Sequence, residues 1–322
     1  MIVKELKYPI YIKKLEALLL RLPPTHIKRK EISEEIAKQL AGFKGEQSLD
    51  YYLSFLPENH LILHDLRLKF KQHHFQIDTL ILTFSFFLIL EVKNLSGRLI
   101  FDHHNQQLIR KLNDIEEVFP DPLLQAKRQK YQMVEWLRKN KFKNIPFEEV
   151  VVITNSSSHI EATPSDLMQT RIIRNTYIIE KVKELQATFK DEELYLKRDL
   201  LKLSQALINN HEAKDIDVLQ KFNILESELI KGVQCVECNN IPMKHHLGKW
   251  NCSNCENISK DAHLKTIKDF QLLSDLPLTN RRLRDMLFLQ SKSISKKYLV
   301  SLKLHHTGTT RDRVYHFHNN EA

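Results

Sequence analysis

The sequence predicts an α/β or α+β core followed by two smaller modules. A helical segment, several strand-like runs, an amphipathic helix and a further apolar strand follow one another between residues 42 and 160. All four cysteines stand in two Cys-x2-Cys pairs within residues 231–260. Residues 261–322 are basic and carry helix-capping signals. These three observations define the predicted organisation.

Composition places the chain among folded proteins. Of its 322 residues, 42% are hydrophobic and 28% are charged. The excess of 49 Lys and Arg over 40 Asp and Glu gives a net charge of +9, which favours an anionic partner. The longest apolar run, Thr79–Leu90, is too short to cross a bilayer. The N-terminus lacks a secretion signal, so we expect a cytoplasmic protein without membrane insertion.

Residues 1–41 are interpreted as a helical lead-in. Ser33 is a candidate cap for a short helix that Gly42 would close. A second helix is expected from Gly45, with apolar side chains at helical spacing until Pro57 interrupts it. The first predicted domain, residues 42–160, would therefore begin with this second helix.

Strand-like runs come next along the chain. The predicted strands are residues 61–68, 75–82, 86–93, 98–102 and 107–112. Asp121-Pro122 then begins an amphipathic helix over 122–140, and residues 148–155 form a continuous apolar run typical of a buried strand. Residues 161–230 are interpreted as a charged helical connector without a recognisable chemical motif.

Charged side chains at two strand ends are the strongest candidate for chemistry. Glu91 and Lys93 lie on one face of their strand, because side chains alternate with a period of two. If the hairpin turns at residues 84–85, Asp78 falls opposite Glu91, at a Cβ separation of about 5 Å. Two carboxylates that close need a cation such as Mg²⁺, or Mn²⁺, or a shared proton. The alternative is a solvated salt bridge at the end of a strand.

Two further side chains fit the same site. Glu46 supplies a third carboxylate from the preceding helix, and Gln125 on the following helix is placed to position water or phosphate. Lys93 would orient the attacking water or stabilise developing negative charge. The predicted catalytic set is Glu46, Asp78, Glu91, Lys93 and Gln125, with Asp78 and Glu91 as metal ligands.

These residues occur in an ordered series of short motifs. They are Gly45-Glu46, Ile77-Asp78, Glu91-Val92-Lys93-Asn94 with Gly97 after it, and Asp121-Pro122-x-x-Gln125. The series resembles the nuclease-related domain (NERD) family of the PD-(D/E)xK nuclease-like superfamily, over about residues 42–155. The resemblance implies a restriction-endonuclease-like mixed sheet flanked by helices. It also implies active-site roles for Glu46, Asp78, Glu91 and Lys93, with Gln125 as an accessory residue.

The cysteine pairs predict a metal site of a different kind. Cys235 and Cys238 are followed, after thirteen residues, by Cys252 and Cys255. Two such pairs place four thiolates around Zn²⁺, as in a zinc ribbon, predicted here over residues 231–260. Because a site closed by four thiolates leaves no open coordination position, the predicted role of the metal is structural.

The C-terminal segment predicts nucleic-acid binding. Residues 277–318 contain nine Lys or Arg and two acidic residues, a balance of 9 − 2 = +7. We expect a helix capped by Thr279 or Asn280, a second helix capped by Ser293 or Ser295, and a hairpin wing turning at residues 307–312. The candidate nucleic-acid contacts are Arg281, Arg282, Lys296, Lys297, Arg311 and Arg313. The alternative is an ordinary solvated helix pair.

Two hypotheses arise from these features. The first is a metal-dependent nuclease that hydrolyses phosphodiester bonds, in DNA rather than RNA, with C-terminal modules that hold the nucleic acid. The second is a non-catalytic nucleic-acid-binding or scaffolding protein with a degenerate nuclease fold. A basic protein of the membrane surface is a third, weaker alternative, because no amphipathic anchor stands out.

Overall fold

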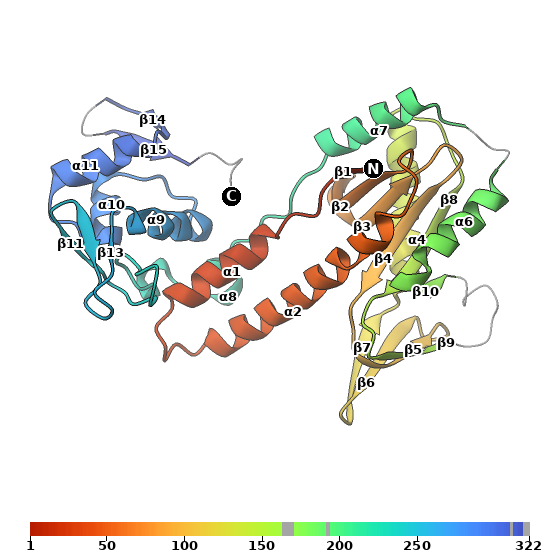
Figure 1. Cartoon of the computed structure of the whole chain (residues 1–322), viewed down its shortest axis with the longest axis horizontal. Helices are drawn as coiled ribbons and strands as arrows, with labels where there is room; N and C mark the ends of the chain where they lie inside the picture. The colour runs from red at the N-terminus through yellow and green to blue at the C-terminus, as the bar shows by residue number, and fades with distance from the viewer. Residues whose placement is uncertain (163–170, 191–193, 310–311, 318–322) are drawn as a thin grey trace. The chain divides into compact units, whose positions relative to one another are not determined.

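The computed structural model describes residues 1–162, 171–190, 194–309 and 312–317 (Figure 1). By its internal contacts the chain divides into two units. Unit 1 consists of Met1–Lys7 and Lys38–Lys214, and unit 2 of Tyr8–Ala37 and Asp215–Ala322. The five-part division expected from the sequence stays a prediction.

A six-stranded mixed sheet forms the centre of unit 1 (Figure 1). Its strands, in spatial order, are β1 (Ile2–Lys4), β2 (Leu61–Phe70), β3 (His73–Leu82), β4 (Phe87–Lys93), β8 (Phe147–Ile153) and β10 (Ile172–Arg174). β2, β3 and β4 pair antiparallel, whereas β1 pairs parallel with β2, and β4, β8 and β10 run parallel. The mixed α/β class expected from the sequence is confirmed.

Helices cover both faces of this sheet. They are α3 (Leu49–Leu53), α4 (Pro122–Lys139), α6 (Ile178–Thr188) and α7 (Lys197–Asn209), with a short 3-10 turn at Asn175–Tyr177 before α6. Ile89 of β4 packs in the cluster that contains α4 and α7, whereas Leu88 and Leu90 pack in the cluster that contains α3 and α6. Odd-numbered side chains of β4 therefore face α4, and this face includes Glu91 and Lys93.

A second sheet of four strands comes after the end of β4. Its spatial order is β7 (Ile115–Pro120), β6 (Gln107–Leu112), β5 (Gly97–Asp102) and β9 (Ser158–Ala162). Strand β7 was not expected from the sequence. Asn113 and Asp114 both adopt positive φ, 48° and 61°, and so form the tight turn that pairs β7 with β6.

The predicted helix break at Gly42 is wrong. Helix α2 (Arg29–Gln47) continues through both Gly42 and Gly45. A Cβ on Gly45 would lie 2.6 Å from Cβ of Asn94, which directly follows β4. Gly45 is therefore required for close approach of the helix to the strand end, and it does not mark a helix boundary.

Unit 2 combines helices with two small sheets. Its elements are α1 (Ile10–Arg21), α8 (Val218–Phe222), a 3-10 turn (Glu226–Glu228), β11 (Lys244–His246), β12 (Lys249–Asn251), β13 (Ile258–Ser259), α9 (Ala262–Leu273), α10 (Asn280–Leu287), α11 (Lys292–Ser301), β14 (His305–Thr307) and β15 (Val314–His316). Helix α1 belongs to this core: buried Arg21 donates to both Asp269 Oδ2, at 2.7 Å, and Gly232 O, at 2.8 Å.

The C-terminal elements have the expected helix, helix and hairpin order. Thr279 caps α10 by accepting from Arg282 N, as predicted. The cap of α11 is Ser291, which accepts from Ile294 N, so the predicted caps Ser293 and Ser295 are wrong. β14 and β15 form the hairpin, and Leu278 adds a β-bridge to Tyr315. The winged-helix arrangement itself stays a prediction.

Candidate active site and cysteine cluster

Asp78 and Glu91 lie on neighbouring antiparallel strands. Thr79 of β3 pairs with Leu90 of β4, and this register places Asp78 across from Glu91. Asp78 Oδ2 accepts a hydrogen bond of 2.8 Å from Val92 N. The register is decisive, because a slip of one residue would turn one of the two carboxylates to the opposite face of the sheet.

Glu91 is the buried centre of the cluster. It is 1% exposed, and each of its oxygens has a partner. Lys93 Nζ donates to Oε1 at 2.6 Å, and Gln129 Nε2 donates to Oε2 at 2.7 Å. Lys93 Nζ also reaches Gln125 Oε1 at 3.3 Å. Strand β4 and helix α4 therefore fix the carboxylate and the ammonium relative to each other.

Glu46 is brought to this cluster by the last turn of α2. Asn94 Nδ2 donates to Ala41 O at 2.7 Å, which fastens α2 to the chain just after β4. Glu46 is close enough to raise the pKa of Asp78, and Glu91 in turn raises that of Glu46. The structure thus gathers all five predicted catalytic residues, from α2, β3, β4 and α4, in one region of unit 1.

Electrostatics show how crowded the carboxylates are. Burial, followed by the charges of Asp65 and Glu91, raises the pKa of Glu46 to about 8. Burial and the charges of Glu91 and Glu46 raise the pKa of Asp78 well above its usual range. Lys93 opposes both shifts without cancelling them. The cluster therefore has an excess of negative charge that a bound cation would relieve.

Sequence reasoning missed Asp65 and Gln129. The pairs on either side of Asp65, His64 with Thr79 and Leu66 with Ile77, place it across from Asp78 on β2. Its φ of 47° is unusual in a strand, and no hydrophobic periodicity signals such a backbone conformation. Gln129 lies four residues after Gln125, so the helical period offered a signal for it.

The four cysteines form a compact cluster in unit 2. All four Sγ atoms lie within 4.8 Å of one another; Cys235 and Cys255 are 3.6 Å apart, and Cys238 and Cys252 are 3.5 Å apart. A tetrahedron with Zn–S bonds of about 2.3 Å has edges of about 3.8 Å. The thiol donors and their spacing thus fit zinc, and the cluster is compatible with a zinc ribbon.

The two cysteine pairs have the same local geometry. Cys235 N donates to Asn240 O, and Cys252 N donates to Asn257 O, both at 2.9 Å. The residue after each pair has positive φ, 59° at Asn239 and 61° at Glu256. Each pair is therefore a tight knuckle that directs its thiols to one point. No other group of three or more Cys, His, Asp or Glu ligands within the described ranges is as compact.

The histidines and basic residues have varied environments. His64 is fully buried in β2, and burial lowers its pKa to about 4. Lys296 and Lys297 of α11 are exposed, as is Arg281 of α10. Arg282 is held by Glu226 at 2.8 Å, and Arg313 donates to Thr309 O at 2.7 Å. Arg311 lies outside the described residues.

The comparison with family models identifies the carboxylate region. Residues 41–154 match the nuclease-related domain. This chain therefore carries a NERD domain match over about a third of its length, which contains the end of α2, α3, β2 to β8 and α4. The resemblance stated from the motifs is confirmed. Neither the curated proteins nor the solved structures gave a match.

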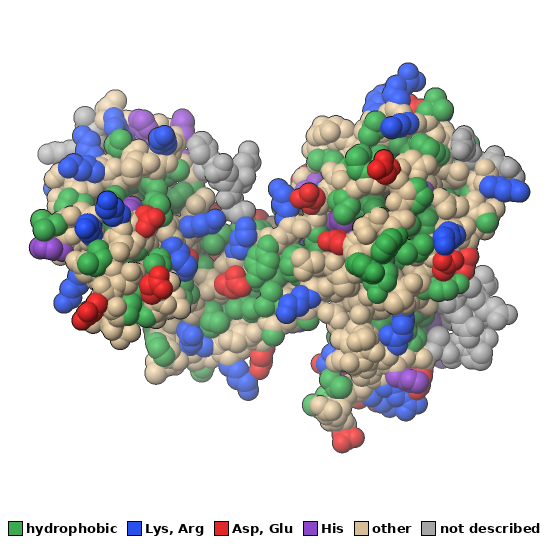
Figure 2. Space-filling view, in the orientation of Figure 1, with side chains coloured by type: hydrophobic (Ala, Val, Ile, Leu, Met, Phe, Trp, Pro, Cys, Tyr) green, Lys and Arg blue, Asp and Glu red, His purple; other side chains and the backbone are tan. Residues whose placement is uncertain are grey.

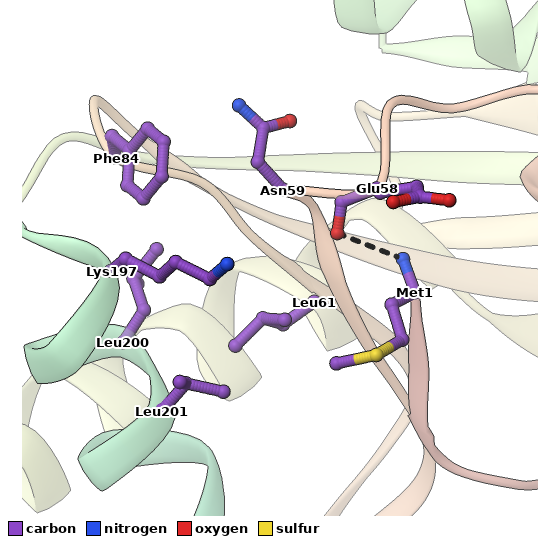
Figure 3. A pocket seen from close by; sticks show the side chains of 8 residues that line it. All are labelled: Met1, Glu58, Asn59, Leu61, Phe84, Lys197, Leu200 and Leu201. Carbon is purple, nitrogen blue, oxygen red and sulfur yellow. Dashed lines mark hydrogen bonds between the residues drawn. The ribbon is translucent and has the colours of Figure 1, made fainter.

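A separate cavity in unit 1 does not belong to the NERD carboxylate site. It has a volume of about 550 Å³ and contains none of the five predicted catalytic residues. Figure 3 shows Lys197, Leu200 and Leu201 of α7 on one side of it and Met1 and Glu58 on the other. Glu58 is its one acidic lining residue among those described, so it offers no paired carboxylates.

Surface charge and helix length add two general findings. On the face shown in Figure 2, Lys and Arg side chains are spread among acidic and hydrophobic ones. None of the helices within the described part of the chain has the length and apolar character needed to traverse a bilayer.

Proposed function

We propose that the NERD domain of this chain is a metal-dependent nuclease that hydrolyses phosphodiester bonds in DNA. The observation that carries the proposal is the convergence of Glu46, Asp78 and Glu91 on Lys93 within the matched residues. The function rests on these side chains because a fold alone does not define an activity.

The donor set fits a hard divalent cation. Asp78 and Glu91 would hold Mg²⁺ or Mn²⁺, because carboxylate oxygens are preferred ligands of these ions. The pKa of Asp78 is raised by burial and then by the charges of Glu91 and Glu46, which a bound cation would offset. When bound, the ion supplies an activated water and neutralises charge at phosphorus. Glu46 would assist this pair, and the three carboxylates together are not as compact as the cysteine cluster.

Side chains of the NERD domain supply the remaining chemistry. Lys93 Nζ, held between Glu91 and Gln125, is placed to donate to a phosphate oxygen as negative charge develops. Gln129 fixes the orientation of the Glu91 carboxylate through a hydrogen bond of 2.7 Å. Glu46, whose pKa is raised to about 8, holds its proton near neutral pH and is suited to donate it there.

Unit 2 would hold the nucleic acid. Exposed Arg281, Lys296 and Lys297 are available for phosphate contacts, and the cysteine cluster would bind a structural Zn²⁺. Preference for DNA over RNA and a cytoplasmic location remain parts of the proposal. The second candidate, a non-catalytic nucleic-acid binder, is favoured by the same basic surface and requires no turnover.

Cleavage assays test the proposal directly. Plasmid, single-stranded DNA and RNA are incubated with the full chain and Mg²⁺ or Mn²⁺. We expect Lys93→Ala to lower the cleavage rate by about 10²- to 10³-fold. Lys127→Ala, at an exposed position of α4, is the matched control and should cleave at the wild-type rate. Equal rates for the wild type and Lys93→Ala under every metal would refute the catalytic assignment, and salt-sensitive binding without product would support the second candidate.

A further inference from the structure

A cavity of about 590 Å³ lies at helix α10 of unit 2. Its lining residues are Thr279, Arg281, Arg282, Arg284, Asp285, Phe288, Leu289 and Gln290. Three arginines and one exposed aromatic ring thus line a single hollow. Positively charged side chains bind the phosphates of a nucleic-acid strand, and aromatic faces stack on its bases. The combination therefore indicates a nucleic-acid-binding surface.

The charge in this cavity is not balanced by its neighbours. Asp285, the one acidic residue among the described lining, is paired with Lys231 at 2.6 Å. Arg282 is paired with Glu226. Arg281 has no ion pair within the described ranges, and Arg284 donates through Nε to the neutral Asn280 Oδ1 at 3.2 Å. Two guanidinium groups therefore remain available to an anion.

Phe288 is exposed in a fixed position. It ends α10 with φ of 54° and is 54% exposed. One edge of its ring lies against Gly232, where an added Cβ would be 3.1 Å from Phe288 Cε2. A left-handed conformation is costly for a bulky residue, so the surroundings must hold it. The exposed ring is thus presented next to Arg281 and Arg284 and does not fold back into the core.

We propose that this cavity binds an unpaired nucleotide of a nucleic-acid strand, with its base stacked on Phe288 and its phosphate on Arg281 and Arg284. The inference deepens the proposed nucleic-acid binding of unit 2 and rests on it. A base within a duplex has both faces covered by its neighbours, so the site selects single-stranded segments or ends.

Binding of fluorescent oligonucleotides to the full chain, without added Mg²⁺, tests the proposal. The probes are a ten-nucleotide oligo(dT) and a duplex of the same length. Phe288→Leu keeps apolar bulk without an aromatic face, and we expect it to weaken oligo(dT) binding by roughly 5- to 150-fold while duplex binding stays unchanged. Phe288→Trp should restore binding of oligo(dT). Arg281→Gln should weaken both probes and lower the salt dependence by about one counterion.

The outcomes separate this inference from the proposed function. Wild-type affinity of Phe288→Leu for oligo(dT), with near-wild-type circular dichroism, would overturn the stacking site alone and leave nucleic-acid binding intact. Competition by free thymidine monophosphate at the same concentration as oligo(dT) would overturn the assignment to a strand. Failure of the wild type to bind either probe would overturn both the stacking site and the proposed nucleic-acid binding of unit 2. The cleavage assay with Lys93→Ala is independent of all three results.

Discussion

The carboxylate cluster of unit 1 and the cysteine cluster of unit 2 are built in opposite ways. The carboxylates come from α2, β2, β3 and β4, and meet only because the sheet aligns those elements. The thiols come from two knuckles between Cys235 and Cys255, each closed by its own backbone hydrogen bonds. One site depends on the tertiary fold, whereas the other depends on short local turns.

This difference determines what each cluster needs from a metal. Leu88, Ile89 and Leu90 of β4 are all fully buried, so the sheet can hold repelling carboxylates together before any cation binds. The strands around the cysteines are only two or three residues long. We therefore expect the metal to stabilise the folded state at the cysteines, and to relieve charge in an already folded site at the carboxylates.

Replacement of a cysteine ligand should have the largest effect. We expect Cys252→Ser to release the metal and unfold the knuckles, because structural zinc contributes on the order of 10 kcal/mol of apparent binding free energy in small zinc domains. The two tryptophans separate the units: Trp250 is buried beside the cluster in unit 2, and Trp136 lies on α4 in unit 1. Fluorescence of Trp250, measured in a Trp136→Phe background, should report the loss of folded structure in unit 2.

Ser253→Ala, within the same knuckle but outside the ligand set, is the matched control and should keep its metal. In a Trp250→Phe background, Trp136 should report the same unfolding midpoint for the Cys252→Ser variant as for the wild-type cysteine set. A fall in the stability of unit 1 as large as that of unit 2 would contradict the comparison.

The pH dependence of unit 1 tests the crowded carboxylates, with a smaller expected effect. The pKa of Glu46 is raised to about 8, so the folded state favours its protonated form. Protonated Glu46 therefore stabilises the folded state fully below its ordinary pKa near 4.5, and this contribution is lost as pH rises through 8. We expect the metal-free protein to lose on the order of 3 kcal/mol of unfolding free energy over this range, after allowance for the partial exposure of the side chain.

Chemical denaturation monitored by Trp136, at pH values from 5 to 9, measures this dependence. Glu46→Gln should make the unfolding free energy less dependent on pH. For the wild-type protein, Mg²⁺ added at pH 8 should restore the unfolding free energy that is lost at this pH. Glu148→Gln on β8, a glutamate with no ion pair within the described ranges, is the matched control. Parallel profiles for the wild type and Glu46→Gln would show that Glu46 is not part of the crowded cluster.

The same contrast explains how far the sequence predicted the molecule. The cysteine knuckles were predictable because each is defined by residues within six positions of one another. Asp78 and Glu91 were predictable because one hairpin with a short turn joins their strands, and a period of two then aligns them. The mixed sheet was predicted only through the family resemblance, which the ordered motifs around Glu46, Asp78, Glu91 and Gln125 carry.

Features set by close packing between distant segments were not predictable. Gly45 was expected to begin a second helix, but its missing side chain serves contact with Asn94, 49 residues later, and one helix continues through it. Asp65 joins the carboxylates through a left-handed φ that no pattern of apolar residues signals. The association of α1 with α9 depends on buried Arg21 and Asp269, which are 248 positions apart.

Helix capping provides the smallest and most local test of the comparison. Asp121 caps α4: its Oδ1 accepts from Leu123 N at 2.8 Å, and its Oδ2 lies 3.1 Å from His103 Nδ1. Asp121→Ala should lower the unfolding free energy of unit 1 by about 1 kcal/mol, and Asp121→Asn by less, because an amide oxygen still accepts at the cap. Ser291→Ala removes the equivalent bond from α11 in unit 2 and should cost about the same.

The two cap variants should lose similar stability but differ in their effect on the two sites. Helix α4 carries Gln125 and Gln129, which contact Lys93 and Glu91, so a frayed α4 should also shift the pH dependence of unit 1. Helix α11 contributes no ligand to the cysteine cluster, so Ser291→Ala should leave metal content unchanged. Metal loss from Ser291→Ala, or an unaltered pH profile for Asp121→Ala, would show that the distinction between a fold-dependent site and a locally closed site is wrong.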